Sequence, residues 1–381
     1  MTVVLSEGAQ WGEGDAWRVA PDPILTIGTQ SGSEEFQLVA VAAAVRQSDG
    51  GIVAVDRGAR AVRLYDSRGH FVRTLGGGGS GPGEFLDPSS IVLGPGDSVA
   101  VWDGRLLRLT RFDASGALAA VETLDLARIA RALEPPLYPG SVEPLADGGF
   151  LVRIVEKSAK TPPSGMARLR SGALRVSADL SSIDTLMFFG DTAKIAVDAP
   201  FGRWPIAPPL AMGPVVAHKG NPPRVCIGGQ TGPEILCIVP AGGRVLLRWV
   251  WDPGPVSDEE VRAWREANLR LFGEKLREED ILRMLEQVPT PSVRPDYSDF
   301  TLDGGGNLWV RIGPRGGVKS VEYLVFDPNG VLLGPLTVPP LRILEIGADF
   351  LLGVSRDEVD VERLHLFEIE KTKNALDRGD A

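Results

Sequence analysis

The sequence predicts an all-β protein: a six-bladed β-propeller of four-stranded antiparallel blades, with a helical insertion between blades 4 and 5. Two observations carry this prediction. A pattern of short strands and turns recurs along the chain, which is the sequence signature of a repeat architecture. The 381 residues also include 46 Gly and 30 Pro, a content typical of short strands joined by many turns.

Three copies of the repeat are well preserved. Residues 50–76 and 96–124 follow the same course, with the landmarks Asp56 and Asp103 lying 47 positions apart. In each copy an apolar strand ends in aspartate, and a second strand runs into a turn made of an aromatic residue, Asp, two further residues and Gly. Residues 304–338 repeat this order. The three turns read YDSRG (65–69), FDASG (112–116) and FDPNG (326–330).

Weaker copies fill the remaining chain. They span residues 146–180 and 209–250, and a shortened copy of three strands spans 342–371. We expect residues 16–28 to supply the missing fourth strand, because pairing of the two ends closes the ring and removes its open edges. The predicted organisation is an N-terminal extension (1–15), one propeller domain (16–371) and a disordered tail (372–381).

One segment breaks the β pattern. Residues 256–289 have the apolar spacing of a helix, and Ser257 with Glu260 forms the sequence signature of a capping box. By sequence order the segment joins blade 4 to blade 5. The helical pair either covers apolar surface or forms a lid over the face that carries the turns after each second strand, which we call the top face.

The glycine-rich stretch GGGGSGPGEF (76–85) contains the spacing G-x-G-x-x-G. A dinucleotide-binding loop opens a helix, whereas this stretch is followed by Pro88 and a strand pattern. A P-loop is excluded because Pro82 occupies the position of the lysine. The stretch is therefore predicted to be a turn between two blades.

The segment GPGEFLDPSSIVLGPGDSVAVWDGRLLRLTRFDASGAL (81–118) resembles an NHL-type repeat. From about Trp17 to Lys371, the chain is similar to bacterial six-bladed β-propeller proteins of that kind, a largely uncharacterised group with many exported members. The resemblance implies the fold and favours a periplasmic or extracellular location. The N-terminal residues MTVVLSEGAQWGEG have no basic region and no adequate apolar core, so as written they do not form a signal peptide.

Composition excludes several classes of partner. The formal net charge of −10 argues against general nucleic-acid binding and against adsorption to anionic membranes, since both need a basic surface. No apolar run approaches the roughly 20 residues that span a bilayer. We expect a monomer without a transmembrane segment.

The two cysteines, Cys226 and Cys237, flank a predicted turn centred on residues 231 and 232. That register places them directly opposite each other, where a disulfide can form at a site of close strand approach. The alternative is two small buried side chains, a common role of free cysteine.

Arginines gather in the predicted top-face turns. A guanidinium group presents a planar fork that suits carboxylates and phosphates, although each arginine can instead pair with a neighbouring acid. Trp204 and Trp309 are interpreted as packing between blades. The candidate ligand-binding residues are Asp56, Arg57, Arg60, Asp103, Arg105, Arg153, Arg311, Arg315 and Arg356.

These features favour a non-catalytic scaffold, without a cofactor, that recognises a protein partner or a small anionic ligand on the top face. A contact role for the helical insertion in a cell-envelope complex is a weaker option. The rival hypothesis follows from related propellers: gluconolactonase-like hydrolases and NHL-repeat lyases hold a divalent ion, calcium for example, in the central channel. Asn is scarce, and the three histidines fall on different repeats: His70 and His365 are expected on the surface, and His218 near the end of an inner strand.

Overall fold

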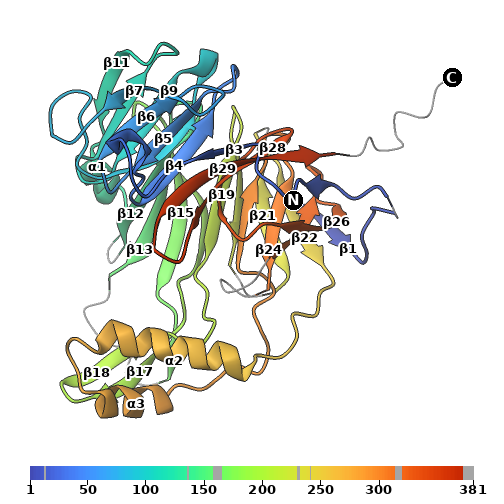
Figure 1. The fold of residues 1–381 in the computed structure, drawn as a ribbon. Coiled ribbons are helices and arrows are strands. Elements are labelled where there is room, and N and C mark those ends of the chain that lie inside the picture. The colour runs from blue at the N-terminus through green and yellow to red at the C-terminus, as the bar shows by residue number, and fades with distance from the viewer. Residues whose placement is uncertain are drawn as a thin grey trace.

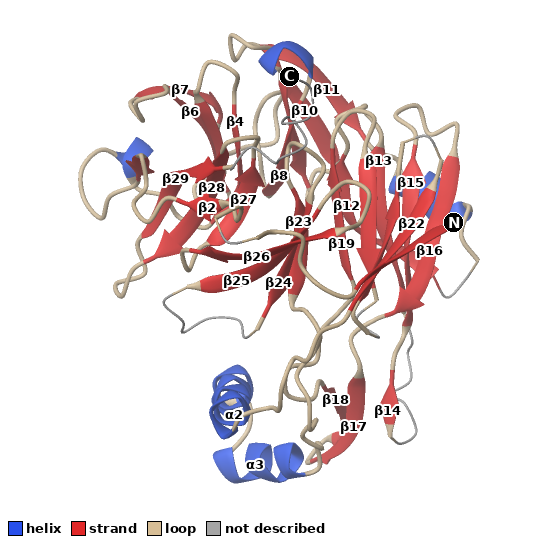
Figure 2. Ribbon diagram, turned by 90° about the vertical axis from the view of Figure 1, so that its right-hand side faces the viewer, coloured by secondary structure: helices blue, strands red, loops and turns tan. Residues whose placement is uncertain are grey.

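The computed structural model describes residues 1–12, 14–134, 137–157, 165–229, 232–240, 242–313 and 320–371 (Figure 1). It confirms a six-bladed β-propeller with a helical insertion between blades 4 and 5. Strands of each blade follow one another in sequence order and pair antiparallel. The first strand of each blade lies innermost and borders the central channel, and Figure 2 shows these strands towards the middle of the ring.

The first three blades arise from residues 41–190. Blade 1 consists of β4 (Val41–Arg46), β5 (Ile52–Asp56), β6 (Ala61–Tyr65) and β7 (Phe71–Gly76). Blade 2 consists of β8 (Pro88–Leu93), β9 (Val99–Asp103), β10 (Arg108–Phe112) and β11 (Leu118–Thr123), followed by the short helix α1 (Leu126–Arg131). Blade 3 consists of β12 (Leu137–Pro144), β13 (Phe150–Glu156), β15 (Arg170–Val176) and β16 (Ile183–Gly190). The glycine-rich stretch joins β7 to β8 between two blades, as predicted. Single 3-10 turns span Glu34–Phe36 and Pro95–Asp97.

The last three blades complete the ring. Blade 4 consists of β19 (Val215–Lys219), β20 (Arg224–Gly228), β21 (Glu234–Ile238) and β22 (Arg244–Trp249). Blade 5 consists of β23 (Asp299–Leu302), β24 (Leu308–Ile312), β25 (Val321–Phe326) and β26 (Leu332–Val338). Blade 6 consists of β27 (Arg342–Ile346), β28 (Phe350–Arg356) and β29 (Glu362–Glu370).

The N-terminal segment runs along the outer edges of three blades. Strand β1 (Thr2–Ser6) pairs in parallel with β22 of blade 4. The amides of Gln10 and Trp11 then donate to the carbonyls of Leu332 and Leu333 in blade 5. Finally β2 (Arg18–Val19) and β3 (Leu25–Ile27) pair antiparallel with β29 and complete blade 6. We call residues 2–27 the N-terminal strap.

The aspartate of the repeated turn motif explains why the motif recurs. In blade 1, Asp66 Oδ1 accepts the amides of Arg68 and His70, two and four residues later. Asp113 and Asp327 make the same bonds in blades 2 and 5. The closing glycine has a positive φ in each turn, 82° at Gly69 for example, which residues with a Cβ rarely adopt.

Six apolar clusters hold the ring together, one between each pair of neighbouring blades. Blades 5 and 6, for example, bury Trp309 and Phe367 together with Trp17 of the strap. The packing of Trp309 between blades is as predicted. The cluster that joins blade 6 to blade 1 includes Leu352 and Tyr65, so the ring is closed by packing as well as by strand pairing. Burying one such large side chain contributes about 1.5–3 kcal/mol.

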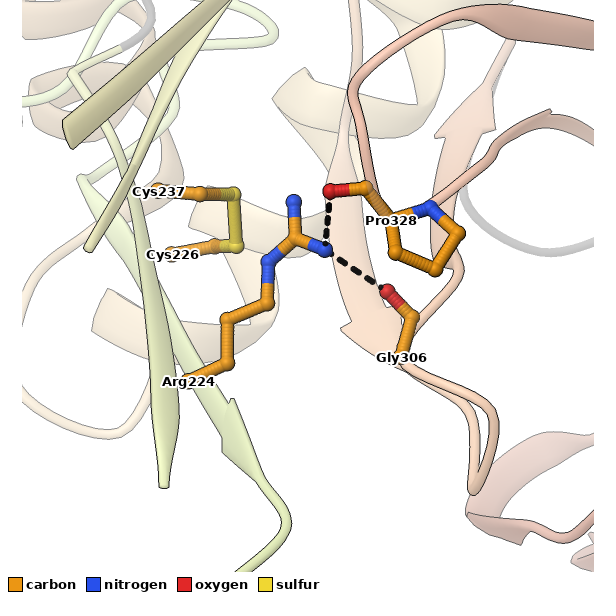
Figure 3. The surroundings of a disulfide bond; sticks show 5 residues. All are labelled: Arg224, Cys226, Cys237, Gly306 and Pro328. Carbon is orange, nitrogen blue, oxygen red and sulfur yellow. Dashed lines mark hydrogen bonds between the residues drawn. A yellow bond between two sulfur atoms is a disulfide. The ribbon is translucent and has the colours of Figure 1, made fainter. Parts of the chain in front are cut away.

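Cys226 and Cys237 form a disulfide inside blade 4. They lie opposite each other in β20 and β21, their Cα atoms are 4.0 Å apart, and both are fully buried. Figure 3 shows Arg224 beside the bond, where its Nη1 donates to the carbonyls of Gly306 and Pro328, both at 2.9 Å. Blade 4 is thereby cross-linked internally and tied to blade 5.

The helical insertion belongs to a small subdomain with its own sheet. The sheet consists of β14 (Met166–Ala167), β17 (Lys194–Ala199) and β18 (Gly202–Ile206), and the helices are α2 (Asp258–Phe272) and α3 (Glu278–Glu286). The predicted capping box of α2 is confirmed, since Ser257 N donates to Glu260 and Glu260 N donates to Ser257 Oγ. The subdomain stands clear of the ring in both ribbon views (Figures 1 and 2).

The helices therefore cover neither the ring nor its channel. Their apolar side chains, such as Ile281 and Leu285, pack against Val197 and Ile206 of the subdomain's own sheet. Trp204 corrects an expectation: it lies on β18, is 41% exposed and stacks edge-on with Phe201 instead of packing between blades. The three connections that form the subdomain, after β13, β16 and β22, all leave the top face.

Candidate functional site

A cavity of about 910 Å³ opens at the top end of the central channel. Its wall comes mainly from blades 5 and 6, together with the start of blade 1 and Ser89 of blade 2. We call it the top pocket. Its charged wall residues are Arg57, Asp299, Arg311, Arg342, Arg356 and Glu362.

Small side chains on blade 1 leave room for the top pocket. The innermost strand β4 has the sequence VAAAVR, and Ala40 and Ala42 line the pocket where a larger residue would project into it. Ala43 and Ala44 of the same strand line a cavity further down the channel. The alanine run of one strand therefore widens the channel along its length.

Arg57 and Arg356 each have a carboxylate partner. Arg57 Nε lies 2.5 Å from Asp87 Oδ1, and this hydrogen bond raises the pKa of Arg57. Arg356 Nε lies 2.9 Å from Glu362 Oε1, and the hydrogen bond to Glu362 raises the pKa of Arg356. Glu362 is itself buried and accepts the amide of Val41, so the Arg356–Glu362 pair ties blade 6 to blade 1.

Arg342 is held differently. Its Nη1 and Nη2 donate to the backbone carbonyls of Ala42, at 3.1 Å, and Val41. Among the described residues no carboxylate lies within ion-pair distance of it. Its side chain is exposed at the pocket, and partial desolvation of the guanidinium lowers the pKa of Arg342; Glu362 opposes the shift, and the charge of Arg356 adds to it. The cation is thus held in place by neutral acceptors.

Blade 5 supplies the facing wall. Arg311 lies opposite Asp299 in neighbouring strands β24 and β23. Tyr323, on the next strand, is 6% exposed. Burial raises the pKa of Tyr323 to about 12, with Arg311 lowering it and Asp299 raising it. The phenol is therefore neutral at physiological pH.

The structure brings together three of the nine residues predicted to bind ligand: Arg57, Arg311 and Arg356. Arg60 and Arg105 are exposed on the same face but do not line the top pocket. Arg153 borders a separate cavity of about 260 Å³ between blades 3 and 4 and pairs with Asp191 at 3.0 Å. Arg315 lies outside the described residues.

The two predicted aspartates are fully buried and bond to the protein itself. Asp56 accepts Arg63 Nη1 at 2.7 Å and the amides of Val39 and Ala59. Asp103 accepts four amides, those of Leu86, Asp87, Arg105 and Leu106. Each carboxylate bonds to the backbone of the top-face connections around its own blade. Neither carboxylate lines the top pocket.

Prediction from the top-face turns missed Arg342, Asp299 and Glu362. Arg342 and Asp299 are the first residues of the innermost strands β27 and β23, which start at the top face. A search for charged residues at the starts of the inner strands would have found both. Glu362, at the start of a third strand, had no comparable indication.

The opposite end of the channel holds a cavity of about 370 Å³. There Lys219 Nζ lies 2.7 Å from Glu345 Oε1, and Arg46 N donates to Glu345 Oε2 at 2.8 Å. His218, on the inner strand β19, lies 3.2 Å from Glu143 of blade 3. We call this the bottom cavity.

His365 is not an ordinary surface residue. Because the strap adds β3 outside β29, His365 lies within the sheet and is partly buried. Its Nε2 lies 2.9 Å from Ser355 Oγ, and its Nδ1 lies 3.0 Å from Thr26 Oγ1. Burial, with a smaller contribution from Arg363, lowers the pKa of His365.

Two kinds of feature are absent from the described part of the chain. No three His, Cys, Asp or Glu side chains within it are placed to share a metal ion. No helix within it has the length and apolar content to cross a membrane.

Comparison with known proteins agrees with the fold. A family model for 6-bladed β-propellers matches residues 33–135. No curated protein matches the sequence. The chain is similar to a solved structure from Bacteroides vulgatus, a member of a family of unknown function, with a TM-score of 0.51, 9% identity, and coverage of 94% of this chain and 100% of that chain.

Two further solved structures are more distant in fold. A candidate exported protein from Bacteroides fragilis has a TM-score of 0.49 and 14% identity, with 98% of this chain and 100% of that chain covered. A catalytically inactive virginiamycin B lyase from Staphylococcus aureus with quinupristin has a TM-score of 0.42 and 12% identity, with 92% and 99% covered.

Proposed function

We propose that this protein is a non-catalytic binding protein whose top pocket holds a small anionic ligand. The observation that carries the proposal is the charge of the wall: four arginines and two carboxylates line a concave pocket of about 910 Å³ in a chain of net charge −10. A pocket of this volume suits a small molecule. Arginine is the side chain best shaped to bind carboxylates and phosphates.

A folded protein partner fits the same surface less well. A specific protein interface buries about 800 Å² on each side and is usually close to flat, whereas the arginines lie inside a hollow between blades. The part of a protein partner that best suits these arginines is an acidic segment that enters the pocket. Binding of such a segment, but of no small anion, would favour the partner hypothesis.

The metal-dependent alternative needs several carboxylates or amides converging on one point of the channel. Several carboxylates of the channel are already engaged within the protein: Glu345 pairs with Lys219, Glu362 pairs with Arg356, and Glu143 lies 3.2 Å from His218 Nε2. We therefore propose no cofactor. Elemental mass spectrometry of the purified protein, with calcium titrated against the melting temperature, tests this point. A stoichiometric metal or a clear calcium-dependent rise would favour the hydrolase or lyase alternative.

The disulfide supports a location outside the cytoplasm, because such bonds persist mainly in oxidising compartments. Protein isolated from its native cells under denaturing, thiol-blocking conditions should contain no free thiol. Two free thiols per chain would contradict export.

Binding itself is tested by isothermal titration calorimetry with small carboxylates and phosphates. We expect saturable binding of at least one class, with one site per chain. Absence of binding across both classes would contradict the proposed function.

A further inference from the structure

Resting on this proposed function, we infer that the ligand of the top pocket is a monocarboxylate with an apolar body. Its carboxylate group binds at Arg342, and its body lies between blades 5 and 6. Three features of the top pocket support this ligand class: its charge, its apolar wall and its free space.

The first feature is the charge. Arg57 and Arg356 are each matched by a carboxylate of the protein, Asp87 and Glu362 respectively. Arg342 instead donates to two backbone carbonyls, which leave its positive charge uncompensated by direct contact. A partly desolvated cation without a direct counterion favours the binding of one negative charge. The four arginines of the wall and the three acids Asp87, Asp299 and Glu362 leave one net positive charge, so a second negative charge on the ligand would be uncompensated.

The second feature is the apolar wall. Ten of the nineteen wall residues are apolar or aromatic, and the phenol of Tyr323 is neutral. Val321 and Tyr323 come from blade 5, and Ile343 and Val354 come from blade 6. Val321, Tyr323 and Val354 are already buried, whereas Ala42, Leu341 and Ile343 are partly exposed. A small hydrophilic anion would leave these last three side chains against water, whereas an alkyl or aryl body would cover them. Each CH₂ group buried contributes about 0.8 kcal/mol.

The third feature is the free space. The backbone of blade 1 that anchors Arg342 is that of Val41 and Ala42. Ala42 itself lines the pocket. The cation and the space for the ligand are therefore adjacent, and both depend on the same short segment of β4.

The experiment compares four probes that differ in one property each: octanoate, acetate without the apolar body, octanamide without the charge, and octyl phosphate, which carries about two charges at pH 8. Calorimetry at pH 8 should show octanoate binding at one site per chain, at least about tenfold more tightly than each other probe.

Amino-acid substitutions test whether octanoate binds in the top pocket. Arg342→Gln should weaken octanoate binding at least about tenfold, and Ala42→Leu should weaken it by filling the pocket without changing any charge. Arg105→Gln is the matched control, because it removes an exposed arginine of the same face outside the pocket; it should leave affinity within about twofold. Circular dichroism establishes that each variant is folded.

The possible outcomes distinguish failure of the proposed function from failure of the inferred ligand class. If neither carboxylates nor phosphates bind, the proposed function fails. If acetate or octyl phosphate binds as tightly as octanoate, the pocket is an anion site and the inferred ligand class is wrong. If octanoate binds but neither Arg342→Gln nor Ala42→Leu weakens it, the site lies elsewhere and the inference is overturned.

Discussion

The two ends of the central channel differ in whether the protein compensates the charge of an inner-strand residue. Strand β27 contributes Arg342 to the top pocket and Glu345 to the bottom cavity. At the bottom, Glu345 meets Lys219 and the amide of Arg46, so its buried charge is compensated within the protein. At the top, Arg342 donates to the carbonyl groups of Val41 and Ala42 and makes no ion pair with a carboxylate of the described residues. A charged residue on an inner strand therefore indicates a ligand only where neighbouring residues of the protein do not compensate its charge.

The largest expected effect comes from breaking the bottom pair. Lys219→Met leaves the 8% exposed Glu345 carboxylate without its cation, which should lower the free energy of unfolding by about 2 kcal/mol, allowing for the partial exposure of Lys219. Urea unfolding measures the change. Octanoate affinity should remain within about twofold of the wild type. The double variant Lys219→Met with Glu345→Gln should recover part of the stability; a large loss of affinity in the single variant would mean that the two ends are not independent.

A second pair of variants compares the space at each end. Ala42→Leu and Ala43→Leu add the same side chain to adjacent residues of β4, the first in the top pocket and the second in the bottom cavity. Each should cost about 1 kcal/mol of stability or less, because both residues border open space. Only Ala42→Leu should reduce octanoate binding. Equal loss of binding in both variants would show that the ligand extends along the channel.

The dependence of octanoate affinity on ionic strength is a smaller expected effect. Raising ionic strength from about 0.05 to 0.3 M screens the attraction between Arg342 and a free anion, so octanoate affinity should fall about two- to threefold. The Lys219–Glu345 pair is more deeply placed, and the stability difference between wild type and Lys219→Met should change less. Affinity that does not depend on salt would indicate that the apolar body alone drives binding.

The smallest effect concerns His365, whose partner Ser355 borders the top pocket. Above pH 6.5 the imidazole is neutral in both the folded and unfolded states. As pH falls through 6.5, the ordinary pKa of histidine, the unfolded chain binds a proton that the folded protein disfavours, because burial lowers the pKa of His365. The free energy of unfolding should therefore decrease over that range. The decrease should be smaller in His365→Gln, as thermal melts at pH 5 and 7.5 will measure.

The sequence predicted the ring well because its strongest pattern is also its most repeated one. The Asp of each FDxxG turn bonds to two amides of its own turn, so the motif needs no distant partner and is visible locally. The subdomain sheet was missed for the opposite reason. Residues 194–206 alternate as any hairpin does, and alternation does not reveal which sheet a hairpin joins. Trp204 was consequently placed between blades.

The candidate site was predicted in part. The position of the turns was enough to predict Arg57, Arg311 and Arg356, because the turns after the second strands do lie at the top face. The same reasoning selected Asp56 and Asp103, whose burial depends on amides and on Arg63 from other segments. Whether a charge faces a ligand or its own protein is a property of packing, which the spacing of residues along the chain does not contain.

The N-terminal strap has a consequence for the time order of folding. Thr26 and His365 are hydrogen-bonded but lie 339 positions apart in the sequence. Strands β2 and β3 must therefore wait, without their partner in blade 6, until β29 has been synthesised. Contacts of such long range form slowly, and unpaired strands aggregate readily. During that interval β2 and β3 would benefit from a chaperone.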